Sequence, residues 1–300
     1  VTVVIHLTAS NETSGNRYFY LDDFTLFGSV IATPTTPGQP GVISGTTELC
    51  AGTAGQTYSI NPVAFATTYN WTVPAGWSIT SGAGTTSITV TAGAGGQNGN
   101  ITVNAENACA TSAARLFAAT VIATPAQPGT ISGTTAQCPG ATSQTYSIAP
   151  VNYAATYNWS VPAGWSITSG AGTTSITVTA GSAGQNGNIT VTAQNTCGTS
   201  SQRTLAVTVS PSAPAQPGAI SGTTALCPGV TSQTYSVAAV TNATSYNWTV
   251  PTGWSITAGA GTNAVTVTAG SFGQNGNISV TAQNSCGTSA GQTIAVTVNP

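Results

Sequence analysis

Charge is what this sequence lacks most. Its 300 residues include no lysine, three arginines, five acidic residues and one histidine, so 3% are charged, against roughly 25% in an ordinary soluble chain. The net charge of −2 provides no basic field for phosphate groups, which excludes nucleic acid as a partner. Because acids, bases and nucleophiles with partners are so scarce, we expect no enzyme, no catalytic residue, no cofactor and no metal.

Long hydrophobic runs are also missing. No apolar stretch approaches the roughly 18 residues of a membrane helix, and the first ten residues lack the basic start of a signal peptide. We therefore expect no membrane insertion. Hydrophobic residues nevertheless make up 40% of the chain, which is enough to build buried cores.

The chain is dominated by a threefold internal repeat. The segment YNWTVPAGWSIT begins at Tyr69 and returns, nearly unchanged, at Tyr157 and Tyr246, with offsets of 88 and 89 residues. A period of this length is typical of small domains that fold by themselves, and it is too long for a solenoid unit. The sequence predicts three modules, at residues 37–123, 125–210 and 214–300.

Within each module the hydrophobic pattern has a period of two. Short segments rich in Thr, Val, Ile and aromatic residues alternate with Gly, Pro, Asn and Ser, as in an antiparallel β-sandwich. The second module is expected to have seven strands, near residues 129–137, 143–149, 155–161, 165–169, 174–180, 187–195 and 202–209. Trp159 is expected to fill the core between the two sheets.

Residues 1–33 do not belong to the repeat. They are expected to form two strands joined by a polar turn, the C-terminal end of a preceding β domain in a longer protein. Residues 18–28, YFYLDDFTLFG, resemble the last strand of bacterial jelly-roll modules, which are often carbohydrate-binding.

The repeat resembles the PKD-like, immunoglobulin-like repeats of large secreted bacterial surface proteins. In the second module the resemblance rests on Cys138-Pro-Gly, Thr145-Tyr-Ser, Tyr157-Asn-Trp, Pro162-Ala-Gly-Trp and Asn195-Thr-Cys-Gly. It implies an all-β fold, a tandem array of three seven-stranded immunoglobulin/PKD-like β-sandwiches after a truncated jelly-roll-like segment. It also implies spacer and adhesin-stalk duties outside the cell.

The six cysteines follow the repeat and are disulfide candidates. Two fall in each module, always 59 residues apart: Cys50 and Cys109, Cys138 and Cys197, Cys227 and Cys286. An even, regular set in a secreted β protein argues for disulfide bonds. Zinc sites need clustered ligands, and these cysteines are not clustered.

Two disulfide connectivities stay open, beside the possibility of reduced thiols. Pairing within each module is the simplest, but the two cysteines of a standard sandwich would lie at opposite poles, too far apart for a bond. Pairing between consecutive modules would join Cys50 to Cys197 and Cys138 to Cys286. Against it, Cys109 would need an upstream partner, and residues 1–33 contain no cysteine.

A few residues are candidates for chemistry. His6 is the only imidazole, and no nucleophile motif accompanies it. Trp77, Trp165 and Trp254 each follow a Pro-x-Gly turn, where an exposed ring could stack on a glycan, although packing across the turn is the alternative.

Two functions therefore remain in view. The first is a structural extracellular stalk or fibre of a bacterial surface adhesin. Its sparse charge favours lateral self-association. Proline-rich linkers and disulfide bonds are the features of this sequence that could stiffen such a stalk. The alternative is a non-catalytic carbohydrate-binding spacer of a secreted polysaccharide-degrading enzyme. Partners would then be further copies of the chain, or glycans and cell surfaces.

Overall fold

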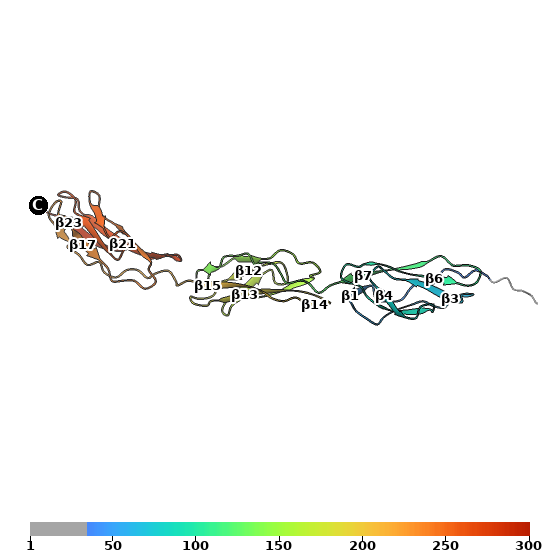
Figure 1. Ribbon diagram of the computed structural model, residues 1–300. Coiled ribbons are helices and arrows are strands. Elements are labelled where there is room, and N and C mark those ends of the chain that lie inside the picture. Colours follow the sequence, from blue (N-terminus) through green and yellow to red (C-terminus); the bar gives the residue numbers. More distant parts are fainter. Residues whose placement is uncertain (1–34) are drawn as a thin grey trace, which may run out of the picture.

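A computed structural model of the chain describes residues 35–300. The predicted strands of residues 1–33, together with His6, lie outside the described residues. Three β modules follow one another in a row, with the C-terminus at the far end (Figure 1). All regular secondary structure within residues 35–300 is β, and each module has its own cluster of buried residues.

The first module contains seven strands. They are β1 (Glu48–Cys50), β2 (Gln56–Ser59), β3 (Thr68–Thr72), β4 (Ser78–Ser81), β5 (Ser87–Thr91), β6 (Gly99–Glu106) and β7 (Arg115–Ile122). They form two facing sheets, with the strand orders β1-β7-β6-β3 and β2-β5-β4. Strand β1 runs parallel to β7, whereas every other pairing is antiparallel.

The second and third modules repeat this arrangement. The second contains β8 (Ala136–Gln137), β9 (Gln144–Ser147), β10 (Thr156–Ser160), β11 (Ser166–Ser169), β12 (Ser175–Thr179), β13 (Gly187–Asn195), β14 (Gly198–Thr199) and β15 (Arg203–Val209). The third contains β16 (Ala225–Leu226), β17 (Gln233–Ser236), β18 (Ser245–Thr249), β19 (Ser255–Ala258), β20 (Ala264–Thr268), β21 (Gly276–Asn284), β22 (Gly287–Thr288) and β23 (Gln292–Val298). The two-residue strands β14 and β22 each add a small hairpin to the expected seven.

Alternation of side chains explains these strands. In β6, Ile101, Val103 and Ala105 point into the core and are fully buried, while the polar residues between them face outward. The tryptophan of the third strand links the two sheets, since the Trp71 indole N–H donates to the Thr85 carbonyl at 2.9 Å. Trp159 packs in the same way against the core of its module but is only partly buried.

The predicted first strand of the second module was too long. Of residues 129–137, only Ala136–Gln137 form a strand, with one isolated bridge at Ser132. Pro125 and Pro128, just before this segment, have no backbone N–H to donate to a sheet. Ile131 is nevertheless buried, so the segment packs against the core without pairing along its length.

A buried tyrosine fastens the start of each module. Tyr58, Tyr146 and Tyr235 are fully buried, and each hydroxyl donates to a threonine carbonyl twelve residues earlier. Burial raises the pKa of all three phenols. In the second module a hydrogen bond from Gln137 acts in the opposite direction on the pKa of Tyr146, but burial has the larger effect.

These tyrosines predict a loss of stability in strong base. Because the folded-state pKa lies above the unfolded value of about 10, this contribution is complete below that pH and is lost as the pH rises through the folded pKa. In a rapid alkaline pH jump, we expect Tyr58, Tyr146 and Tyr235 to ionise only as the β-sheet circular dichroism disappears. Y146F should remove one late-ionising group. The same titration in Y146F as in the wild type, with an intact circular dichroism signal, would contradict this.

Candidate functional site

The modules are joined by two disulfide bonds as well as by the linkers. Cys50 is bonded to Cys197, and Cys138 is bonded to Cys286, each pair with its Cα atoms 5.4 Å apart. This separation lies in the ordinary range for disulfides. The structure thus has the between-module connection. Each bond joins cysteines 147 or 148 residues apart in sequence.

The sheet topology explains why the bonds do not form within a module. Cys50 ends β1, which is parallel to β7, and it lies beside Ile122 at the final residue of β7. Cys109 lies in the turn before β7 begins. Eight residues of strand separate these two levels, a distance of about 23 Å, which no disulfide can span.

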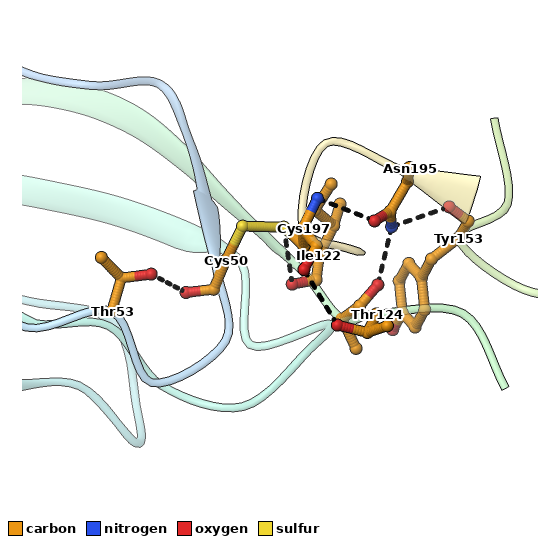
Figure 2. The surroundings of a disulfide bond; sticks show 8 residues. Cys50, Thr53, Ile122, Thr124, Tyr153, Asn195 and Cys197 are labelled. Atoms are coloured by element: carbon orange, nitrogen blue, oxygen red, sulfur yellow. Dashed lines mark hydrogen bonds between the residues drawn. A yellow bond between two sulfur atoms is a disulfide. The ribbon is translucent and has the colours of Figure 1, made fainter. Parts of the chain in front are cut away.

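An asparagine holds each junction together. The Asn195 side-chain amide donates to the carbonyls of Ala123 in the linker, at 2.7 Å, and Tyr153, at 2.9 Å (Figure 2). Its Oδ1 atom accepts the backbone N–H of Cys197 at 2.8 Å. One side chain therefore fixes the linker, a loop of the second module and the disulfide cysteine relative to one another.

The linker between the first two modules is fastened to the second. Three further hydrogen bonds do this: Thr124 hydroxyl to Cys197 carbonyl at 3.1 Å, Gln127 amide to Gln202 carbonyl at 2.7 Å, and Arg203 guanidinium to Pro128 carbonyl at 2.9 Å. Two of the chain's three arginines serve this purpose, because Arg115 donates likewise to Pro40. The proline-rich segment is thus held as part of the module that follows it.

The second junction repeats the first. Asn284 donates to Ser212 in the linker and to Asn242, and its Oδ1 accepts the N–H of Cys286. The glycine after each of these cysteines makes room for the linker. A Cβ on Gly198 would lie 3.3 Å from Thr124.

An aromatic contact adds to the first junction. Tyr153 adopts a positive φ of 63° in a loop of the second module. Its hydroxyl reaches the turn of the first module, 3.0 Å from where a Cβ on Gly96 would lie. A side chain at Gly96 would therefore require the Tyr153 ring to shift. Tyr153 is 42% exposed.

The remaining two cysteines carry no bond. Cys109 and Cys227 are free and exposed among the described residues. Within residues 35–300, no three or more His, Cys, Asp or Glu side chains gather where they could hold a metal ion.

The turn tryptophans belong to the core. Trp77, Trp165 and Trp254 are each 7% exposed, and each indole N–H donates to a glutamine carbonyl at 2.8 Å. A ring enclosed in this way offers no open face to a sugar. Packing across the turn, the alternative stated for these residues, is what the structure has.

Sequence reasoning missed several junction residues. Asn195 stood in the quoted repeat motif, but its bonds run to a linker 72 residues upstream and to a loop 42 residues upstream, and such long-range contacts are not visible in local sequence. The recurrence of Asn-x-Cys at Asn107, Asn195 and Asn284 is the signal that could have revealed it. Arg203 and Tyr153 gave a weaker signal, because Arg115 and Phe65 stand at the equivalent positions of the first module but the third module has Gln292 and Asn242 there.

Comparison with known proteins supports the repeat. A model of the family described as "PKD-like domain" matches residues 36–119, 124–207 and 213–296. No curated protein matches the chain.

Similar solved structures include an I-band fragment of titin and the Escherichia coli adhesin FdeC. The titin fragment is 12% identical, with a TM-score of 0.45, over 88% of this chain and 96% of that one. The adhesin is 14% identical, with a TM-score of 0.45, over 86% of this chain and 96% of that one.

The asparagine bridge predicts how the two disulfides respond to reductant. N195A removes both donors to the linker and loop, which should increase local opening around Cys197. We expect dithiothreitol to reduce Cys50–Cys197 roughly 5- to 30-fold faster, for a loss of about 1–2 kcal/mol of local stability. Mass spectrometry of alkylated peptides would follow each bond separately.

The second junction is the internal control for this measurement. Reduction of Cys138–Cys286 should keep its rate in N195A, and N284A should show the opposite selectivity. Equal acceleration of both bonds, or of neither, would contradict the assigned role of Asn195.

Proposed function

This chain belongs to the PKD-like domain family, and on that premise we propose that it is a structural stalk segment of a large extracellular bacterial surface adhesin. The observation that carries the proposal is the pair of disulfides that connect consecutive modules. Bonds within single modules would stabilise each sandwich alone. Bonds between modules restrain how the modules move relative to one another, which is what a stalk requires.

The two tethers of a junction act together. Cys50 is paired in register with Ile122, so the disulfide and the linker leave the first module side by side. A single polypeptide linker would permit rotation about the row of modules. A second covalent tether beside it opposes this rotation, and the Asn195 bridge and the Tyr153 contact further limit bending.

The composition fits this role. The second and third modules contain no Asp or Glu, so carboxylate-bound calcium does not stiffen the junction between them. Disulfides persist in oxidising compartments, which supports a location outside the cytoplasm. Lateral association of such rods through their Thr- and Ser-lined faces is part of the proposal, because weak charge does little to keep copies apart.

The carbohydrate-binding alternative has less support. The turn tryptophans that suggested it are buried in all three modules. The jelly-roll-like segment at residues 18–28 lies outside the described residues. We therefore propose a mechanical role rather than a glycan-binding one for residues 35–300, and no enzymatic activity.

Small-angle X-ray scattering tests the stalk proposal. The C109S/C227S double variant keeps both junction disulfides and removes the free thiols, so it is the form to compare before and after reduction. We expect a narrow, rod-like distance distribution in the oxidised protein. After dithiothreitol, the mean radius of gyration should fall and the distribution should broaden, while circular dichroism stays unchanged.

Unchanged scattering after complete reduction would show that the disulfides do not control stiffness and would contradict the proposal. The matched control adds C50S/C138S/C197S/C286S to the C109S/C227S protein, which removes all six cysteines. Without reductant, it should already scatter like the reduced protein.

A further inference from the structure

The two free cysteines occupy the two halves of the junction found twice within the chain. Cys227 follows β16, as Cys50 ends β1 and Cys138 follows β8, and all three strands pair in parallel with the last strand of their module. Cys227 therefore lies at the end of the third module where its last strand finishes, which we call the downstream pole. The opposite end of a module is its upstream pole. Its counterparts at Cys50 and Cys138 are both disulfide-bonded to the next module.

Cys109 is the complementary half. Its backbone N–H donates to Asn107 Oδ1 at 2.9 Å, just as Cys197 donates to Asn195. Asn107 in turn donates to Thr35 in the preceding linker and to Phe65. The upstream pole of the first module thus has the bridge that, at both internal junctions, accompanies a cysteine bonded to the module before it.

Exposed aromatic residues mark the same two poles independently. Phe65 corresponds to Tyr153, with a similar positive φ of 67°, and is 65% exposed. Tyr153 covers the turn of the preceding module at Gly96. In the third module the equivalent turn contains Phe272, immediately before Gly273, and Phe272 is 66% exposed. Within residues 35–300, each pole therefore carries one free cysteine and one large exposed apolar side chain.

We propose that two copies of this chain join end to end, with Cys227 of one copy bonded to Cys109 of the next and Phe272 packed against Phe65. A second copy can occupy each pole because it carries the complementary one, and both internal junctions show how such poles fit together. An aromatic pair at this contact would add to the covalent bond and would select the head-to-tail orientation.

The bond forms by thiol–disulfide exchange with a small disulfide such as oxidised glutathione. The Cys227 thiolate attacks one glutathione sulfur, and one glutathione thiolate leaves. The Cys109 thiolate of the second copy then attacks the Cys227 sulfur of this mixed disulfide, and the second glutathione leaves. Two protein thiols are oxidised and one glutathione disulfide is reduced to two thiols, with two protons released by the cysteines.

The turn at Cys109 differs from those at Cys197 and Cys286. A single bridge between Glu106 and Thr111 replaces the pairing that β14 and β22 make in the other modules. Ala110 stands where the second and third modules have Gly198 and Gly287. A Cβ at those glycines would lie nearest to linker residues, Thr124 and Ala213, rather than to the preceding module. The methyl group of Ala110 is therefore expected to face the first module's own linker and to leave the contact with a second copy open.

Two single variants separate this proposal from random oxidation. C109S keeps only the Cys227 thiol, and C227S keeps only Cys109. Each full-length variant, alone and in an equal mixture, would be incubated in a glutathione redox buffer and followed by non-reducing electrophoresis. We expect the mixture to give one dimer, about tenfold faster than either variant alone, a preference equivalent to about 1.4 kcal/mol.

Peptide mapping of this dimer should find Cys109 joined to Cys227, with both junction disulfides retained. Wild-type protein should form a ladder of longer oligomers, and F272S in the C109S background should remove most of the tenfold preference. Absence of a dimer in the mixture, or homodimers formed as fast as the mixed dimer, would overturn the proposal.

This inference uses the same junction as the stalk proposal but fails separately. The scattering experiment concerns stiffness within a C109S/C227S monomer, which cannot join end to end through these thiols. A negative scattering result would not contradict the end-to-end bond, and absence of the mixed dimer would not contradict the stalk proposal.

Discussion

Parallel pairing of the first and last strands is the constraint on which the junctions depend. It brings Cys50 beside Ile122, at the point where the chain leaves the first module. The other cysteine of each module lies in the turn that precedes the last strand, at the opposite pole. A cysteine pair that would be about 23 Å apart within one module therefore comes within bonding distance only across two modules.

With so few charges, the chain fastens its junctions mainly through hydrogen bonds between neutral groups, and the Arg203 guanidinium is the one charged donor named at the first junction. Asn195 uses both ends of its amide, donating to Ala123 and Tyr153 and accepting from Cys197. Such bonds are insensitive to salt, unlike exposed ion pairs. The low charge of the repeats is thus compatible with a firmly connected rod, because none of the bonds at the two internal junctions needs a carboxylate.

Much of the fold could be predicted from sequence, and less of the junction. Period-two patterns and the repeat at Tyr69, Tyr157 and Tyr246 indicated three all-β modules, because buried alternation is a local signal. The sequence left two disulfide connectivities open, within modules and between consecutive modules. The contacts of Asn195 join segments far apart in the sequence, which local patterns do not reveal. The contact of Tyr153 with the turn at Gly96 depends in addition on how neighbouring modules meet. The similarity of the ends that carry Cys109 and Cys227 to the two internal junctions could be recognised only once the structure of those junctions was known.

Disulfide mapping of the unreduced monomer tests the account most directly. Free thiols would first be alkylated under denaturing conditions, and the chain then cleaved after aromatic residues and leucine, since lysine is absent and Leu205 and Leu226 separate Cys197 from Cys227. The account predicts linked peptides containing Cys50 with Cys197 and Cys138 with Cys286, and the alkyl label on Cys109 and Cys227 alone. A peptide in which Cys138 is joined to Cys197, both within the second module, would contradict it.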